Sequence, residues 1–541
     1  MSHLSWSNIS SAAPSSSSYA ELYPSLTSWT LSVPVAIVLL VAARSYMARP
    51  KGKLPPGPPG LPVIGNLHQL TDKLWVTLEK WTKQYGPVVY LNIAGQNTIV
   101  LGTHKAAADL LDRRAGIYSD RPRNIVAGEL LTGGLVFAFA QHNDVWKRMR
   151  RASHEAMNNQ VAKSYFPFQE TESSLLVSEL LASPDLFDSH LRRASTSLVL
   201  SMIYGLPPME DSRDPVILRV NHFTERALKA AIPGAYLVEY FTWMEHLPRW
   251  MCAWRRYAED AFKRDSVLFE NLFADVVTRL KSGDQRPSVA ATIITEQEKK
   301  NLTDKEAAWV SATLYAAGAE TTSGQLAWFM EAMVLYPEVQ ARAQAEIDRV
   351  VGRDRMPTFQ DYDHLPYIKA MVKETLRWNG VGRLGVPHRL AQDDWYEGHF
   401  IPKDTICLVN VWGLNHDTEV YGPDVDDFRP ERFLNEEGEL KAMPTDTKDE
   451  GHVTYGFGRR ICVGRHVSNN SMFIEIASIL WACDIRPGKN EAGEIVMPDP
   501  QNSIDEGLVV RPAPFLCSIT ARSPEVETIL AETKDRHGLP I

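Results

Sequence analysis

The segment YGFGRRICVGR, residues 455–465, places one cysteine between glycines and arginines. Its three glycines permit backbone angles that other residues reach only at a cost, so we expect Cys462 to lie in a tight loop whose amides point at the sulfur. Amide donors stabilise a thiolate. So do the arginines of this segment, Arg459, Arg460 and Arg465. Three chemistries stay open for Cys462: a structural thiol, a nucleophile or a metal ligand.

These three roles differ in the partners that they need. A cysteine nucleophile needs a base, and the nearby His452 and His466 form no recognised arrangement with Cys462. Zinc needs three or four protein ligands, and no second cysteine lies close in the sequence. A single thiolate suits a metal whose other ligands come from a cofactor, and haem iron meets that requirement. A buried structural cysteine is the alternative.

The pattern Tyr455-x-x-Gly458-x-Arg460-x-Cys462-x-Gly464 resembles the haem-ligand loop of the cytochrome P-450 monooxygenases. This resemblance implies haem b as the cofactor, with the Cys462 thiolate as its iron ligand. The family usually has phenylalanine where Tyr455 stands. The aromatic ring is therefore kept, and a hydroxyl group is added beside the cysteine loop.

A predicted helix upstream carries a small polar notch. Residues 317–322, AGAETT, continue the apolar run 307–319. Glycine there lets a ligand approach the backbone, and a threonine hydroxyl can bond a carbonyl one turn back. The segment resembles the oxygen-activation helix of the family, which implies that Thr321 and Glu320 deliver protons. Packing in the helix interior is the alternative for Thr321, and a salt bridge is the alternative for Glu320.

Glu374 and Arg377 are three residues apart, so they share one face of a predicted helix. The pair resembles the Glu-x-x-Arg motif of the family, and residues 430–433, PERF, resemble the segment whose arginine joins that pair. A buried glutamate between two arginines is satisfied only when all three side chains are in place. We therefore expect structural roles for Glu374, Arg377 and Arg432.

Trp146 and Arg150 have i, i+4 spacing, so both can reach one acidic group. The resemblance implies that this group is a haem propionate. It assigns further propionate contacts to three cationic side chains, Arg121, His388 and Arg460. Arginine suits this role because it can bind a carboxylate through two parallel hydrogen bonds. Arg123 and Arg389 lie close enough in sequence to compete for these places.

The surrounding sequence must position these groups, and most of it is predicted to be helical. TDKE, residues 303–306, has the pattern of a capping box and opens a long buried helix, which Pro337 ends. Further elements are a helix at 367–378 and strands at 87–95, 96–102 and within 398–411. No alternation of strands and helices appears. The sequence predicts a mainly α fold with a minor β-sheet region, by resemblance the cytochrome P-450 fold, in one catalytic domain at residues 63–541.

Composition narrows the class of protein. The chain has 541 residues, of which 44% are hydrophobic and 23% charged, as in a globular protein with a large core. Its net charge of −9 makes nucleic acid an unexpected partner. The five cysteines are scattered and include no CxxC motif, so we do not expect a disulfide framework. We therefore expect most of the chain to lie in a reducing compartment.

The N-terminal region has the features of a membrane anchor. Residues 22–43 carry no charge and, as a helix, would span about 33 Å, enough for a bilayer core. Basic residues follow in a proline-rich hinge, 44–62, and none precedes the span. The positive-inside rule then places residues 1–21 in the lumen and the catalytic domain in the cytosol. We expect a single-pass protein of the endoplasmic reticulum membrane with Asn8 as a glycosylation acceptor; a cleaved signal peptide is the alternative.

The resemblance implies a monooxygenase that inserts one oxygen atom of dioxygen into a lipophilic small molecule. The chain looks like fungal microsomal members of the family that act in secondary metabolism. As the substrate class we prefer a terpenoid over a polyketide. The sequence shows no flavin or nicotinamide segment, so electrons should come from a separate NADPH-dependent reductase, with a cytochrome b-type protein as a second donor. A basic patch for this partner is expected at Lys147, Arg148 and Arg151; a solvated helix face is the alternative.

The substrate pocket is expected to be lined by apolar side chains that include Leu130, Leu131, Phe241, Trp243, Leu384 and Val386. Two other functions stay open. One is a haem-thiolate isomerase, dehydratase or peroxygenase that needs no reductase, which Glu320 and Thr321 disfavour. The other is a haem-based sensor.

Overall fold

The computed structural model describes residues 51–209, 215–232 and 234–539. The predicted luminal tail, the anchor at 22–43, Asn8 and the first part of the hinge lie outside the described residues. Within those three ranges, no helix is both long and apolar enough to cross a bilayer.

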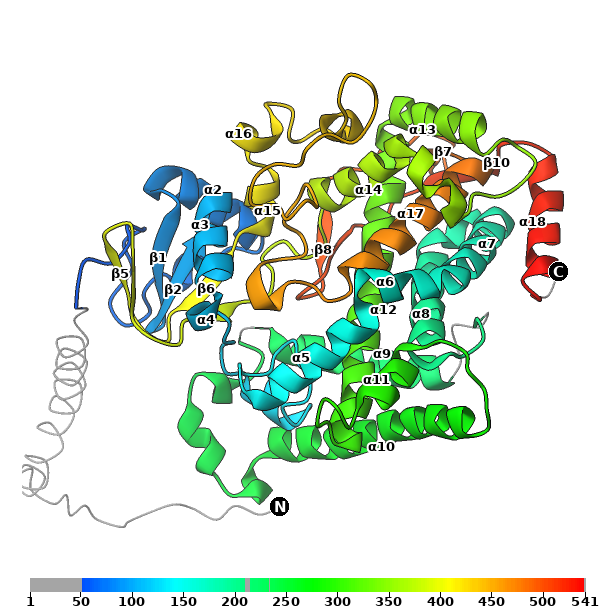
Figure 1. Cartoon of the computed structure of the whole chain (residues 1–541). Coiled ribbons are helices and arrows are strands. Elements are labelled where there is room, and N and C mark those ends of the chain that lie inside the picture. The colour runs from blue at the N-terminus through cyan, green and yellow to red at the C-terminus, as the bar shows by residue number, and fades with distance from the viewer. Residues whose placement is uncertain (1–50, 210–214, 233, 540–541) are drawn as a thin grey trace, which may run out of the picture.

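The chain forms a helical body with a small sheet region at one side, which confirms the predicted mainly α fold (Figure 1). The longer helices are α2 (Leu74–Tyr85), α5 (Asp144–Met157), α7 (Phe166–Ala182), α8 (Phe187–Tyr204), α9 (Pro215–Ala231), α10 (Ala253–Lys281), α11 (Val289–Glu296), α12 (Asp304–Leu335), α13 (Pro337–Val350), α14 (Pro366–Trp378), α17 (Arg465–Ala482) and α18 (Glu525–Arg536). Helix α12 runs through the body, and α8 and α10 pack against it.

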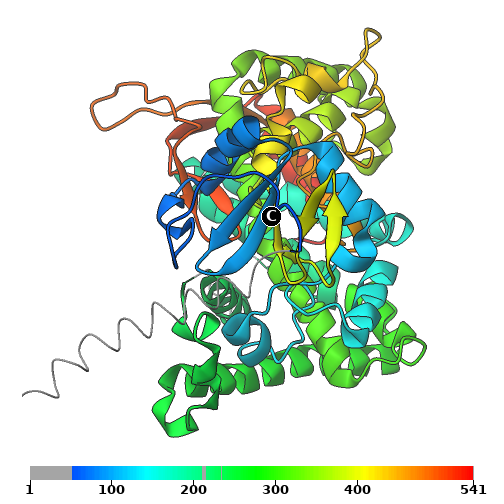
Figure 2. The same ribbon diagram turned by 90° about the vertical axis from the view of Figure 1, so that its left-hand side faces the viewer.

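The main sheet has four strands in the order β1-β2-β6-β3 and faces the viewer in Figure 2. Its strands are β1 (Val88–Ile93), β2 (Gln96–Leu101), β6 (Ile406–Val409) and β3 (His388–Arg389). The predicted hairpin is confirmed: β1 and β2 are antiparallel, and their turn contains Gly95 with φ 91°. Strand β2 pairs with β6 in parallel, and β3 pairs with β6 in antiparallel fashion.

Three two-stranded sheets complete the strand content of the described residues. They pair β4 (Asp394–Tyr396) with β5 (His399–Ile401), β7 (Cys483–Pro487) with β10 (Cys517–Ala521), and β8 (Ser503–Asp505) with β9 (Val510–Pro512).

The predicted capping box is present at the start of α12. The Thr303 hydroxyl accepts a hydrogen bond from the Glu306 amide at 3.2 Å, and the Glu306 carboxylate accepts one from the Thr303 amide at 2.9 Å. The helix ends before Pro337, which begins α13. Burial on all sides is confirmed for residues 307–315 of the apolar run but not for its end, because Ala317 is exposed. That side chain faces a cavity rather than other side chains.

The Glu374 carboxylate is fully buried and lies between two guanidinium groups. Arg377 donates to it from Nε at 2.7 Å and from Nη2 at 2.8 Å, and Arg432 donates from Nε at 2.9 Å. The amide of Arg429 adds a fourth bond, at 2.8 Å. These contacts join α14 to the short helix η10 (Pro430–Phe433). The structure thus brings together the three side chains to which the sequence assigns a structural network.

Removing this carboxylate should destabilise the fold strongly. Glu374→Ala leaves two buried guanidinium groups without their counter-charge, and we expect the free energy of unfolding to fall by about 3–5 kcal/mol. Denaturant titration followed by circular dichroism measures the loss. The control is Glu225→Ala, which breaks an exposed pair with Lys229 at 2.6 Å and should leave the free energy of unfolding nearly unchanged. Equal losses in the two variants would contradict the assigned role.

Candidate active site

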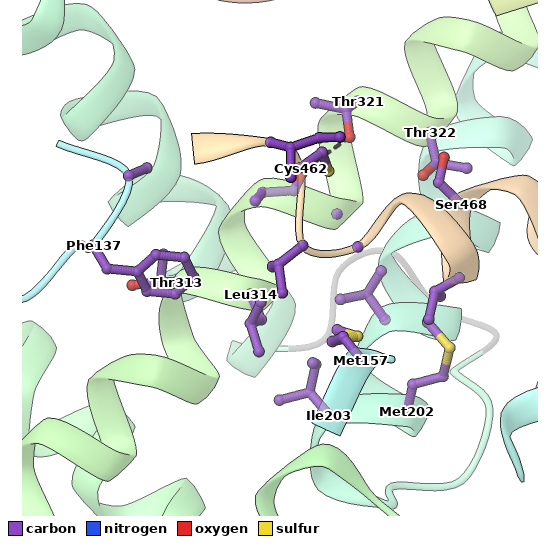
Figure 3. Close-up of a pocket in the computed structure, with 18 of the residues that line it drawn as sticks. Phe137, Met157, Met202, Ile203, Thr313, Leu314, Thr321, Thr322, Cys462 and Ser468 are labelled. Carbon is purple, nitrogen blue, oxygen red and sulfur yellow. Dashed lines mark hydrogen bonds between the residues drawn. The ribbon is translucent and has the colours of Figure 1, made fainter. Parts of the chain in front are cut away.

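A cavity lies between α5, α8, α12 and the segment that leads into α17. Figure 3 shows Thr321 of α12 and Cys462 of the cysteine loop at its wall, with apolar side chains such as Leu314, Ile203 and Met202 nearby. The cysteine loop and the threonine notch, which the sequence assigned to chemistry, therefore meet at one cavity. Cys462 is the one cysteine among the described residues that line this cavity.

The cysteine loop is tight, as its glycines predict. Gly458 has φ 61°, and a Cβ atom there would lie 2.0 Å from the carbonyl oxygen of Leu111. Its amide donates to the Asp112 carboxylate. The Cys462 amide donates to the Tyr455 carbonyl at 2.8 Å, which closes the loop. Glycine is therefore required at position 458 for both conformation and space.

The Cys462 side chain lies deep in the protein and is nevertheless exposed, because it faces the cavity. Burial raises the pKa of the Cys462 thiol, while the Gly464 amide and the guanidinium groups of Arg150 and Arg465 act in the opposite direction. The sequence predicted that Arg459, Arg460 and Arg465 stabilise the thiolate, and this prediction is wrong for two of the three. Arg459 is exposed to solvent, and Arg460 is bound elsewhere.

Three arginines form a cationic wall of the cavity: Arg121, Arg150 and Arg460. Backbone carbonyl oxygens hold all three. Arg121 Nη1 donates to Val386 at 2.6 Å, Arg150 Nη2 donates to Ile461 at 2.5 Å, and Arg460 Nε donates to Ser119 at 2.8 Å.

Burial and the mutual repulsion of these groups lower the pKa of Arg121 well below its usual range. Mainly through burial, the pKa of Arg460 falls to about 9. Charged groups held only by neutral carbonyls favour an anionic ligand, and two carboxylates would satisfy this wall. The propionates of haem fit this chemistry.

Trp146 and His388 are committed to other partners. The Trp146 indole donates to the Phe137 carbonyl at 3.1 Å, and the Arg460 guanidinium lies over its ring at 4.1 Å. Trp146 lines the cavity and supports Arg460 by this cation–π contact. His388 is buried behind the cavity wall, with Nδ1 2.8 Å from the Tyr118 carbonyl. Burial, reinforced by Arg121, lowers the pKa of His388 well below its usual range, so this imidazole is neutral.

The two competing arginines are engaged in ion pairs. Arg389 binds Asp120 at 2.6 Å, and Arg123 binds both Glu129 and Glu245. These pairs leave Arg121 as the cation of its segment that lines the cavity.

Thr321 and Glu320 point to different surroundings. The Thr321 hydroxyl donates to the Ala317 carbonyl at 2.7 Å, one turn back as expected, and its side chain lines the cavity. Glu320 is not among the lining residues, and its carboxylate pairs with Arg192 at 2.8 Å. The salt bridge that the sequence left open is the arrangement found for Glu320.

The unexpected Tyr455 has a defined partner. Its hydroxyl donates to Asn469 Oδ1 at 2.7 Å, and Asn469 donates to Glu450 at 2.9 Å. The added hydroxyl therefore ties the cysteine loop to the first turns of α17.

Much of the apolar wall was missed from the sequence. Helix α8 contributes Leu198, Val199, Met202 and Ile203, and α5 contributes Met157. Apolar helical spacing was the only signal available, and every core helix shares it. Of the predicted pocket residues Val386 does line the cavity, but Phe241 and Trp243 are 52% and 62% exposed on the surface. The expectation for these two aromatic residues is wrong because their segment turns outward between α9 and α10.

Comparison with known proteins agrees with this geometry. Residues 55–517 match the family described as Cytochrome P450. A cytochrome P450 monooxygenase of Armillaria gallica is 50% identical over 510 residues, covering 94% of this chain and 97% of the relative. Cytochrome P450 monooxygenase 58 of Postia placenta is 45% identical over 95% of this chain and 98% of its own length. Cytochrome P450 monooxygenase iboC of Amanita muscaria is 40% identical, over 94% and 98%.

The chain therefore belongs to the cytochrome P450 family. It is a cytochrome P450 monooxygenase, an oxidoreductase whose cofactor is haem bound through a cysteine thiolate. The lining residues fit that cofactor, since they offer one thiol opposite a threonine notch and a wall of three arginines.

Loss of charge from the cationic wall should weaken haem retention. Arg460→Gln removes a buried cation that faces the cavity, and a charged hydrogen bond contributes about 1.5–3 kcal/mol, so haem loss should accelerate by about tenfold or more. Transfer of haem to an excess of apomyoglobin measures this rate. Arg459→Gln makes the same charge change at the exposed neighbouring position and should leave the rate unchanged. Equal acceleration in both variants would count against a propionate site at Arg460.

Proposed function

We propose that this monooxygenase oxidises a lipophilic small molecule of secondary metabolism, with a terpenoid preferred, and that it takes electrons from a separate NADPH-dependent reductase. The composition of the cavity supports the lipophilic character of the substrate. Apart from the cationic wall, its lining is mainly aliphatic, aromatic and hydroxyl side chains, and none of the described lining residues is acidic. An apolar pocket without a carboxylate favours an uncharged, apolar substrate over a cationic amine.

Haem, when bound, supplies the binding and activation of dioxygen. The protein positions the substrate, excludes water and delivers protons. Thr321 and Thr322 of the α12 notch both line the cavity, and the Thr321 hydroxyl is the one that bonds the carbonyl one turn back. Its proton is held on the Ala317 carbonyl and can be passed on as another proton is received. Glu320 supports this step only if its pair with Arg192 opens, so we assign the relay to Thr321 first.

Membrane association is part of the proposal. The short helices η6 (Leu237–Glu239), η7 (Thr242–His246) and η8 (Arg249–Met251) lie between α9 and α10, at the lower left of Figure 1. They expose large apolar side chains: Leu237, Tyr240, Phe241, Trp243, Trp250 and Met251. Such a patch suits the interface of a bilayer, where tryptophan and tyrosine are enriched. Together with the predicted anchor, it supports the endoplasmic reticulum membrane as the location.

The basic patch that we propose for the reductase contains fewer available cations than the three that the sequence suggested. Arg148 is partly buried and pairs with Glu306 at 2.6 Å, so it belongs to the contact between α5 and α12. Lys147 is half exposed and pairs weakly with Asp144, and Arg151 is exposed. These two cations of α5 are the ones that an acidic partner could reach.

Replacement of Thr321 should uncouple electron use from product formation. Thr321→Val keeps the branched shape and removes the hydroxyl, and we expect the product formed per NADPH consumed to fall by about tenfold or more. Thr321→Ser keeps the hydroxyl and should retain most of the coupling. Simultaneous assays of NADPH, peroxide and product measure the ratio. Full coupling in the valine variant would remove Thr321 from the relay.

The substrate class can be tested in membranes that contain the enzyme and a reductase. Terpenoid, polyketide and cationic amine panels are incubated with NADPH, and mass spectrometry detects the gain of one oxygen atom. We expect products from the apolar panels and none from Cys462→Ala, which should also lose the carbon monoxide absorption band that gives the family its name. Exclusive oxidation of amines would contradict the apolar substrate. Equal turnover with peroxide and no reductase would favour a peroxygenase.

A further inference from the structure

Helix α7 packs against both α8 and α17, and polar side chains of all three helices are buried there (Figure 1). We call it the polar seam and define it by Gln169 and Glu172 of α7, Arg193 of α8, and Ser471 and Glu475 of α17. Each of these side chains is at least nine-tenths buried. Four of their polar atoms have no hydrogen-bond partner: Gln169 Oε1, Arg193 Nη2 and both carboxyl oxygens of Glu475.

One end of the polar seam reaches the cavity. Ser471 lines the cavity wall, and Gln169 Nε2 donates to its hydroxyl at 2.8 Å. Gln169 Nε2 also donates to the Val467 carbonyl at 3.1 Å. Glu475 follows Ser471 by one helical turn, so it lies on the same face of α17. The buried Glu475 carboxyl therefore lies one turn along α17 from the Ser471 hydroxyl, which faces the cavity.

The centre of the polar seam is the Glu475 carboxyl, which is 0% exposed. The charged groups that act on it are Glu172 of α7 and Arg193 of α8. Burial, and then Glu172, raises the pKa of Glu475 to about 8, and Arg193 opposes this effect. The carboxyl is therefore protonated at neutral pH. A buried acid with two unpartnered oxygens carries a large desolvation cost, which internal water molecules relieve where a polar space can hold them.

The other end of the polar seam reaches solvent. Arg193 donates to Glu172 at 2.6 Å and pairs with Glu179 at 2.7 Å. Glu179 is 26% exposed and lies 3.7 Å from His190. A row of ionisable groups thus runs from the protein surface to the neighbours of Glu475.

We propose that the polar seam is a hydrated proton passage between solvent and the cavity, in which Glu475 is the buried acid that exchanges protons. The Glu475 carboxyl gives its proton to water or hydroxyl groups on the side of Ser471, and Arg193 stabilises the carboxylate that results. Water molecules of the polar seam carry the replacement proton from solvent at Glu179 and His190 to Glu172, because the Arg193 guanidinium that joins the two carboxylates donates hydrogen bonds to both but does not pass on a proton. The passage reaches the cavity at α17, and it is therefore a separate route from the Thr321 notch of α12. A monooxygenase consumes protons with each dioxygen, so this route serves the established reaction.

Infrared spectroscopy of the holoenzyme tests whether Glu475 exchanges its proton. At neutral pH the protonated carboxyl has a characteristic C=O band, which should disappear in Glu475→Gln. After transfer to D₂O, the wild-type band should shift within minutes, because water reaches the carboxyl. A shift as slow as the exchange of the core amides of α17 would show a sealed carboxyl and would overturn the proposal.

Glu331→Gln is the matched control. Glu331 of α12 is also 1% exposed, has an unpartnered oxygen and a pKa raised to about 8 by burial, and lies outside the polar seam. This variant should keep the Glu475 band and lose only its own. Glu475→Asp retains a carboxyl, should shift the Glu475 band instead of abolishing it, and identifies that band if Glu475→Gln does not fold. The carbon monoxide spectrum reports folding of all three variants.

Steady-state oxygen consumption with a reductase tests whether the exchange feeds the reaction. Glu475→Gln should at least double the solvent deuterium isotope effect on this rate and leave the rate of the first reduction unchanged. Glu331→Gln should change neither. Rapid exchange of the Glu475 band combined with an unaltered isotope effect would reduce the polar seam to a hydrated pocket and would refute its role in proton supply.

Discussion

Glu374 is the carboxylate on which the arrangement of the cysteine loop depends. It is completely buried, so its hydrogen bonds from Arg377 and Arg432 cannot be exchanged for water without a large cost. Arg377 continues the chain of contacts by donating to the Asn415 carbonyl at 2.9 Å. Asn415 then holds the residues that begin the cysteine loop, Val453 and Thr454. The position of Cys462 is thus tied to a charge network on a different helix.

The cavity has three walls with different chemical properties: the cationic wall, the face of α8 and the notch of α12. The cationic wall has guanidinium groups held by carbonyls, which attract carboxylates. The face of α8 that lines the cavity is mainly aliphatic. Helix α12 interrupts this apolar surface with threonine hydroxyl groups, and the one on Thr321 donates its proton to the Ala317 carbonyl. Each wall comes from a different part of the chain, and α8 and α12 pack directly against each other.

Short motifs predicted the chemistry well where spacing alone fixes geometry. The i, i+3 spacing of Glu374 and Arg377 places both on one helix face, and the glycines of residues 455–465 require a tight loop. The same reasoning failed for Phe241 and Trp243, because a hydrophobic side chain in a loop serves a pocket or a surface equally well. It also could not decide the surroundings of Glu320, since Arg192 lies 128 positions away in the sequence.

The sequence by itself determined the mainly helical fold, the capping of α12, the cysteine loop and the residue types of the site, because these depend on local backbone preferences and on spacing along one element. Only the tertiary structure decided which arginines face the cavity, that α8 forms its apolar wall, and that Tyr455 bonds Asn469. It also brought Glu475 beside Glu172 and Arg193. These outcomes depend on how separate helices pack, and packing of distant segments is encoded in the whole core rather than in any one motif.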